Sequence, residues 1–217
     1  MARLITKIEQ QKRNPSRFNI YVNNEYATSV HEDVLVRCRL SKGQVIEDED
    51  WMHILVQEER DKAKQTALKY ARYKPRTQAE IERHLQAKGY NPEYISATLV
   101  WLKSYGYVDD QAFAKAWVEE RRRLHGKGRY ALRQELKQKG IDEQWIAEAL
   151  EAIDNEEERQ LAYAWGQKRY ERVKHLEWSQ IERRIGSFLQ RKGFSLSNIT
   201  DVLHELRVRH GGENQDS

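Results

Sequence analysis

LQAKG at residues 85–89 recurs as LKQKG at residues 136–140 and as LQRKG at residues 189–193. The glycines that close these segments stand 51 and 53 residues apart, and an aliphatic residue lies eight positions before each of them. A residue typical of helix starts follows each glycine two positions later. A supersecondary unit repeated in this way predicts stacked copies, so function is expected on surfaces and not in one catalytic pocket.

Each repeat is predicted to be three helices, because aliphatic residues recur every three or four positions on one face. In the first repeat, Thr77 and Glu80 form a T-x-x-E capping box that starts the middle helix. Gly89 ends that helix in left-handed geometry, and Asn91 caps the next one. We therefore predict three three-helix domains stacked into an elongated array. Their ranges are residues 59–109, 110–154 and 155–210.

The N-terminal part of the chain has a different pattern. LITKI at residues 4–8 and the alternating RFNIYV at residues 17–22 favour β-strands. Asn23-Asn24 is a candidate two-residue hairpin turn, because asparagine tolerates the positive φ that such turns need. We predict a small antiparallel sheet of two or three strands, then a short helix over residues 31–40 that Gly43 closes.

The predicted fold class is therefore mainly α, with three tandem three-helix repeats and a small N-terminal antiparallel β-hairpin or sheet plus helix over residues 1–58. Residues 211–217 are polar and predict a disordered tail. Six Trp and eleven Tyr argue against a disordered chain, although 33% of the residues are charged.

Cysteine usage and hydropathy limit where the protein works. Cys38 is the only cysteine, which excludes a disulfide within the chain and fits a reducing compartment. No stretch has the apolar length that spans a bilayer, and the N-terminus lacks the apolar segment of a signal peptide. We therefore expect a cytoplasmic protein that does not contact membranes.

The motifs of common enzymes are absent from the sequence. There is no phosphate-binding loop, and the seven histidines lack zinc-type spacing. Asp109-Asp110 could be a metal or acid–base pair, but a helix N-terminus gives adjacent carboxylates an ordinary capping role, which we favour. Trp117, Trp145 and Trp165 stand at core spacings, so core packing is favoured over base stacking. We expect no enzyme, cofactor, metal site or small-molecule substrate.

Charge changes sign along the chain. Residues 115–139 carry nine Lys/Arg and three Glu, residues 142–158 carry eight Asp/Glu and no base, and residues 159–193 again carry nine Lys/Arg and three Glu. This separation favours basic patches that meet an acidic protein face or a phosphate backbone, against an ordinary solvated helical surface. The candidate partner-binding residues are Arg121, Arg122, Arg123, Lys127, Arg129, Arg133, Arg169, Arg172, Lys174, Arg183 and Arg184.

Three segments resemble the RecX family of recombination regulators. The most specific is GYVDDQAFAKAW at residues 106–117, followed by Arg121. Residues 76–89 and 132–141 resemble the first- and second-repeat segments of that family, with Thr77 where serine is usual. The resemblance covers residues 60–155 well and the third repeat more loosely, and the N-terminal hairpin is similar to that of longer members. The motif residues, expected to be structural, are Asp109, Asp110, Phe113, Ala114 and Trp117.

The resemblance implies a protein that binds the RecA recombinase filament in DNA repair and recombination. Family members lie along the groove of the filament and mainly inhibit its ATPase, strand-exchange and co-protease activities, and some also bind DNA. The family has no assigned catalytic residues, so none is carried over. On this reading, replacing both Arg122 and Arg129 by glutamate should weaken inhibition.

Two other functions remain open at this point. The repeats could be helix-turn-helix-like modules that bind single- or double-stranded DNA through the basic patches. Against this, the third helix of the second repeat carries Glu143, Glu148 and Glu151, which would repel phosphate. The chain could also be a passive scaffold without a regulatory role.

Overall fold

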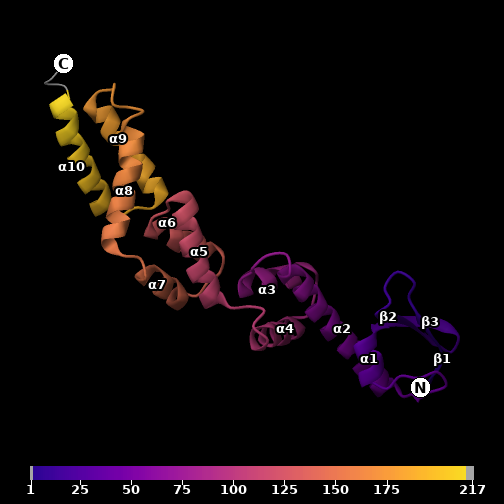
Figure 1. Ribbon diagram of the computed structural model, residues 1–217. Coiled ribbons are helices and arrows are strands. Elements are labelled where there is room, and N and C mark those ends of the chain that lie inside the picture. Colours follow the sequence, from indigo (N-terminus) through magenta and orange to yellow (C-terminus); the bar gives the residue numbers. More distant parts are fainter. Residues whose placement is uncertain (1, 214–217) are drawn as a thin grey trace. The chain divides into compact units, whose positions relative to one another are not determined.

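The computed structural model describes residues 2–213, which form ten helices and four strands (Figure 1). They divide into two compact units. The first unit contains the chain up to Pro75 together with Ile81–Tyr107, and the second contains Arg76–Glu80 together with the chain from Val108 on. The mainly helical fold with a small N-terminal sheet is the one that the sequence predicts.

The first unit opens with a four-stranded antiparallel sheet of order β3-β2-β1-β4. Asn23 and Asn24 have φ of 51° and 68°, which confirms the predicted tight turn between β2 and β3. β4 was not predicted, because a strand of two residues has no period to detect. The strands are β1 (Arg3–Gln10), β2 (Arg17–Val22), β3 (Glu25–His31) and β4 (Val45–Ile46).

The short helix after the sheet, α1 (Glu32–Arg37), ends earlier than predicted. The left-handed residue after it is Arg39, with φ of 49°, so the prediction that Gly43 closes this helix is wrong. Gly43 has φ of 87° in the turn before β4, where its N–H donates to the carbonyl of Ile5 at 2.8 Å. Arg39 and Gly43 thus both adopt left-handed geometry. The sequence predicts this geometry only for the glycine, because other residues rarely adopt it.

One long helix, α2 (Asp48–Ala71), serves two partners in the first unit. Its first half buries Trp51 and Ile54 in the core beneath the sheet, and its second half packs on α4 (Pro92–Ser104). Buried Glu58 ties the helix to the sheet, because its carboxylate accepts from Arg17 at 2.6 Å and from the backbone N–H of His31 at 2.8 Å. The predicted boundary between residues 58 and 59 thus falls inside α2.

The capping box before α3 (Gln78–Ala87) is confirmed. The backbone N–H of Glu80 donates to Thr77 Oγ1 at 3.1 Å, and the N–H of Thr77 donates to the Glu80 carboxylate at 3.2 Å. Burial disfavours the charged form of Glu80, but hydrogen bonds from Lys139 and from the Thr77 N–H outweigh it, so the pKa of this carboxyl is lowered.

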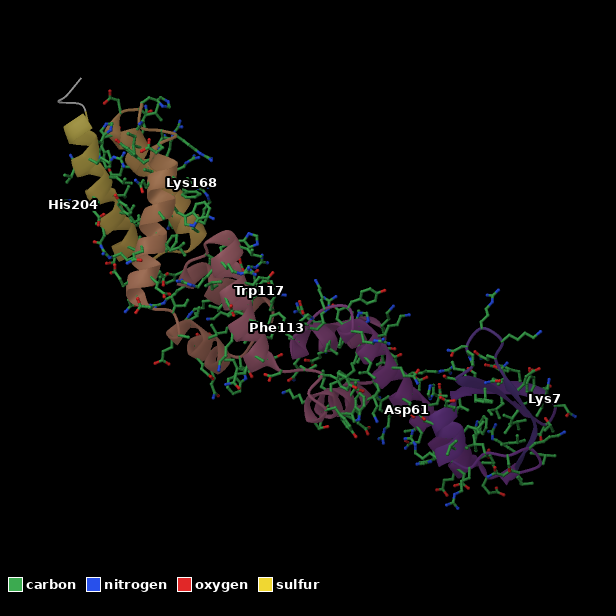
Figure 2. All side chains as sticks on the ribbon, in the orientation of Figure 1. Lys7, Asp61, Phe113, Trp117, Lys168 and His204 are labelled. Carbon is green, nitrogen blue, oxygen red and sulfur yellow. The ribbon has the colours of Figure 1, made fainter. Side chains whose placement is uncertain are left out.

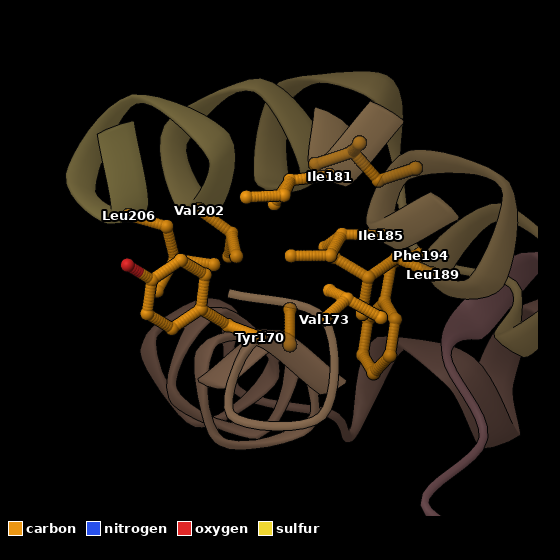
Figure 3. Packing of buried hydrophobic residues seen from close by; sticks show 10 residues of the cluster. Tyr170, Val173, Ile181, Ile185, Leu189, Phe194, Val202 and Leu206 are labelled. Carbon is orange, nitrogen blue, oxygen red and sulfur yellow. The ribbon is translucent and has the colours of Figure 1, made fainter. Parts of the chain in front are cut away.

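The second unit holds two further sets of three helices, each around its own core. In the last set, Ile181, Ile185 and Leu189 line one face of their helix and pack against Tyr170 and Val173 (Figure 3). The helices are α5 (Asp110–His125), α6 (Arg129–Gln138), α7 (Glu143–Glu151), α8 (Asn155–Tyr170), α9 (Trp178–Lys192) and α10 (Leu196–Glu213).

The end of α10 changes one prediction. The helix continues through residues 211–213, so the expected disorder from residue 211 is wrong for those three positions. Residues 214–217, the rest of the predicted tail, lie outside the described residues. The predicted breaks at 109/110 and 154/155 coincide with Asp109 and Asp154, which cap α5 and α8 with their side chains.

The lysine-glycine turns of the second and third repeats each accept a hydrogen bond from the residue that precedes a middle helix. The carbonyl of Lys139 accepts from Thr77 Oγ1 at 2.7 Å, just before α3, and the carbonyl of Lys192 accepts from the N–H of Gly128 at 2.9 Å, just before α6. A Cβ at Gly193 would overlap the backbone of Ala131. Within the second unit, the turn at Gly193 therefore seats on the start of α6, the middle helix of the repeat before it.

The third repeat departs from this pattern at one end. α3 and α6 begin 11 residues before their turn glycines, at Gln78 and Arg129, whereas α9 begins 15 residues before Gly193, at Trp178. Ile181, buried within α9, stands where the other two repeats have the helix-starting residue that receives a turn. The four extra residues amount to about one helical turn.

Replacement of the turn glycines by alanine should separate conformational strain from close packing. Gly89 and Gly193 have φ of 80° and 88°, but a Cβ at Gly89 meets nothing within 4 Å. Gly89→Ala should lower the free energy of unfolding by about 1 kcal/mol from left-handed strain alone. Gly193→Ala should lower it by about 3 kcal/mol, because overlap with α6 is added. Urea unfolding followed by far-UV circular dichroism, with the transition of each unit fitted separately, measures both, and equal losses would contradict this account.

Candidate partner-binding surface

Most of the predicted partner-binding cations on α5 and α6 are paired with carboxylates inside the second unit. Arg133 lies 2.7 Å from Glu143, and Arg122 lies 3.8 Å from Glu157. The basic and acidic segments that alternate along the sequence therefore lie side by side in the fold. The inference from separated signs to open basic patches fails for these residues, because the folded chain supplies their counter-charges.

Arg129 is a structural residue. Its guanidinium lies 2.9 Å from the buried carboxylate of Glu158 and also donates to Asn155 at 2.6 Å and to the carbonyl of Ile153. Its backbone N–H, at the first residue of α6, donates to Glu158 as well, at 2.9 Å. The Glu158 carboxylate, on α8, therefore accepts from a free N–H at the positive end of α6 and also neutralises the charge of Arg129. These two interactions hold α8 against α6.

Trp117 stands at the centre of a second paired group. Its indole Nε1 donates to the Glu135 carboxylate at 3.0 Å, and Arg121 and Lys127 each lie 3.3 Å from the same carboxylate. Lys139 Nζ lies 4.4 Å from the centre of the Trp117 ring, in a cation–π contact. The same ammonium group pairs with the Glu80 carboxylate at 2.9 Å. The group is half-buried and carries its own counter-charge.

The remaining predicted cations are more open. Arg123, Arg172, Arg183 and Arg184 are exposed and form no ion pair within residues 2–213, whereas Lys174 pairs with Glu171, three residues earlier, at 3.0 Å. Three of these four arginines are spread over the end of α5 and one side of α9. They are the predicted site residues that a partner can reach without breaking an internal pair.

Arg169 lies apart from the paired cations as well. It is half-buried, and its guanidinium lies 5.8 Å from the ring centre of Phe188. It lines a small pocket together with Arg172 and Trp165. No carboxylate lines this pocket, which distinguishes it from the group around Trp117.

The D-D-x-x-F-A motif is structural in this fold. Asp109 caps α5 by accepting from the N–H of Ala112 at 2.8 Å, which confirms the capping prediction. Asp110 reaches the start of another helix and accepts from the N–H of Gln78 at 2.9 Å. Ala114 is fully buried, and Phe113 stacks on Trp117 with ring centres 5.7 Å apart. Figure 2 labels both aromatic residues on α5.

The three tryptophans predicted for the core lie at its edge. Trp117 and Trp145 pack half-buried against the core of the second repeat, and Trp165 does so in the third. Helical spacing places a residue on a face but not at a depth, so their exposed edges were not foreseen. The lysines of two lysine-glycine steps, Lys139 and Lys192, lie over the rings of Trp117 and Trp165.

Two features are absent from the described residues. No helix within residues 2–213 is both long and apolar enough to cross a bilayer. No group of three or more His, Cys, Asp and Glu in the same range is placed to hold a metal ion.

Four family models match successive parts of the chain. "Regulatory protein RecX N-terminal domain" matches residues 3–47. The first, second and third three-helix domains of RecX match residues 63–102, 109–150 and 156–203. The third match strengthens the part of the resemblance that is weakest in the sequence motifs.

Relatives agree over nearly the whole chain. Regulatory protein RecX of Bacillus subtilis is 36% identical over 206 residues, which are 95% of this chain and 78% of the relative. That of Clostridium tetani is 32% identical over 209 residues, covering 95% of this chain and 96% of the relative. A crystal structure of regulatory protein RecX has a TM-score of 0.77 at 32% identity and covers 92% of this chain and 98% of the other. A crystal structure of RecX from Lactobacillus salivarius has a TM-score of 0.65 at 25% identity and covers 70% of this chain and 99% of the other.

The fold defines a helical repeat protein, in which three-helix sets follow a small N-terminal sheet and carry a lysine-glycine turn each. The matches to all four domain models, together with these relatives, identify the group more closely. The chain belongs to the RecX family of regulatory proteins. Its relatives carry the name of a regulatory protein and not that of an enzyme.

The clamp between α6 and α8 can be tested with two adjacent glutamates. Glu158→Gln should lower the free energy of unfolding of the second unit by about 2 kcal/mol, because Arg129 keeps its charge in a half-buried place without a carboxylate. Glu157→Gln should cost less than about 0.5 kcal/mol, because that side chain is exposed and 3.8 Å from Arg122. Urea unfolding measures both variants, and similar losses would mean that the clamp does not stabilise the unit.

Proposed function

We propose that this protein regulates RecA by binding the RecA filament and mainly inhibiting its ATPase, strand-exchange and co-protease activities. The observation that carries the proposal is the match to the N-terminal domain and to all three helical domains of RecX along the chain. The protein would act in the cytoplasm by contact alone, without catalysing a reaction. Cations that the fold leaves open support a docking role for its surface.

The face of α9 that bears Arg183 and Arg184 is the best candidate for contact with the filament. Both arginines are exposed and form no ion pair within the described part of the chain. Arg122 and Arg129, which the sequence favours for mutation, hold Glu157 and Glu158 and are unsuitable, because their replacement by glutamate would damage the fold. Unpaired surface charge of this kind sets association rate and register at a partner surface.

The DNA-dependent ATPase of RecA tests this proposal. Substoichiometric amounts of the protein should inhibit the ATPase, and Arg183→Glu with Arg184→Glu should raise the amount needed for half-inhibition about tenfold. Lys12→Glu with Lys42→Glu is a matched control, because it makes the same change of charge at exposed residues of the first unit and should leave inhibition unchanged. Absence of inhibition at every ratio would refute the proposed function, and equal effects of the two variants would move the interface away from α9.

A DNA-binding function remains the alternative. In the structure, Glu143 of α7 pairs with Arg133 and Lys137, and Glu148 pairs with Lys115 at 2.6 Å. The pairing reduces the repulsion that acidic α7 would exert on phosphate, although it also occupies the cations. Gel shifts with single- and double-stranded DNA, with and without RecA, separate the two functions. Binding to DNA alone that falls steeply with added salt would favour the alternative.

A further inference from the structure

The second and third repeats carry the same group of an aromatic ring and cations at equivalent positions. Trp117 lies in the first helix of the second repeat and Trp165 in the first helix of the third. The lysine of each lysine-glycine step covers its tryptophan: Lys139 Nζ lies 4.4 Å from the ring centre of Trp117, and Lys192 Nζ lies 3.7 Å from that of Trp165. An arginine follows each tryptophan by four residues. The two groups are therefore copies of one arrangement.

One difference between the copies removes a carboxylate from the centre of the group. Five residues before the turn glycine, the second repeat has Glu135 and the third has Phe188. Glu135 accepts from Trp117 and lies 3.3 Å from Arg121 Nε. In the third repeat the Phe188 ring lies 6.1 Å from that of Trp165. The Nε atoms of Arg121 and Arg169 are both buried without a hydrogen-bond partner among residues 2–213, but only Arg121 has a carboxylate close by. The third repeat keeps the tryptophan, arginine and lysine but lacks the carboxylate.

Further cations gather where this carboxylate is missing. A pocket of about 140 Å³ is lined by Trp165, Lys168, Arg169, Arg172 and Phe188. Lys168, labelled in Figure 2, stands where the second repeat has Glu120, so its charge is reversed relative to its counterpart. Burial, together with the charges of Lys127 and Lys168, lowers the pKa of Lys192. Three cations and two aromatic rings thus line the pocket, and no acidic residue of the described part of the chain is among its lining residues.

We propose that this pocket binds a carboxylate side chain from an acidic segment of a protein partner, in the place that Glu135 fills in the second repeat. The carboxylate would accept hydrogen bonds from Arg169 and Arg172, and the neighbouring apolar part of the segment would contact Phe188. This inference deepens the proposed function, on which its biological setting rests, by naming the chemistry of the partner at this pocket.

The geometry favours a carboxylate over a nucleobase or a free metabolite. Bases bind aromatic side chains by stacking on an open ring face. Lys192 and Lys168 lie over the ring of Trp165, at 3.7 and 5.2 Å, and Lys192 is held there by a hydrogen bond to the carbonyl of His125 at 2.6 Å. The pocket is also smaller than the several hundred Å³ typical of small-molecule sites. It fits one side chain that projects from a larger partner.

Binding of a labelled acidic peptide to the full chain tests this inference. The probe is a fluorescein-labelled dodecapeptide of glutamate and aspartate with a central leucine, and fluorescence anisotropy measures its Kd. Phe188→Glu should weaken binding at least about tenfold, because it installs the carboxylate of the second repeat. Phe188→Gln, of similar size and neutral, should stay within about threefold of wild type. Glu135→Gln should strengthen binding about threefold, because it opens the second-repeat copy.

The outcomes are distinct from those of the RecA assay. Circular dichroism should show equal helicity for all variants. The inference is overturned if the peptide binds wild type and Phe188→Glu alike, or if it binds neither. It is also overturned, in favour of a nucleic acid, if a labelled oligothymidine binds with the same dependence on residue 188 and the peptide does not. RecA takes no part in this measurement, so the two assays can fail independently. The pocket can bind acidic peptide when the protein does not inhibit RecA, and the protein can inhibit RecA when the pocket does not bind the peptide.

Discussion

The second unit depends on close contact between backbones, which glycine alone allows. At Lys192-Gly193 the chain leaves α9 in left-handed geometry, and the same two residues lie against the N-terminus of α6. The carbonyl groups of the turn accept the N–H groups that a helix start leaves free, so the end of one helix satisfies the beginning of another. A side chain at Gly193 would force the two backbones apart. One residue type therefore sets both the shape of the turn and the spacing between repeats.

The charges of the chain follow from this packing. Once the repeats are seated, the acidic residues of α7 and the start of α8 lie beside the basic residues of α5 and α6, and most pairs close within 4 Å. Pairs such as Arg129 with Glu158 are partly buried and help to fix the helices, whereas exposed pairs add little stability. A high content of charge thus marks internal organisation in this protein. The cations that remain open on α9 and around Trp165 are informative because the rest are occupied.

The sequence predicts the Asn23-Asn24 turn and the Thr77–Glu80 capping box because each depends on residues that are close together in the chain. It predicts the three repeats because the same local pattern recurs after 51 and 53 residues. Prediction from the sequence fails where the interaction partner of a side chain lies far away in the chain. The carboxylate of Asp110 was assigned to its own helix but caps α3, and the pairing of Arg129 with Glu158 spans 29 residues. Among the candidate site residues, pattern alone selects basic segments but cannot tell which arginines already have partners. The sequence shows that Glu135 and Phe188 stand at equivalent positions of two repeats. It does not show that Glu135 contacts Trp117, and this contact is what makes the difference between the repeats informative.

The extra turn of α9 removes a contact site that the other middle helices have. The residue before α3, Thr77, and the residue before α6, Gly128, each donate a hydrogen bond to the lysine carbonyl of a glycine turn. The equivalent residue of the third repeat, Ile181, lies inside the continuous helix α9, where its N–H donates to the carbonyl of Glu177 at 3.1 Å. Arg184 stands where the small Ala131 receives Gly193 in the second repeat. A helix that continues through this position uses the N–H for its own backbone, so α9 offers no seat of this kind to a glycine turn.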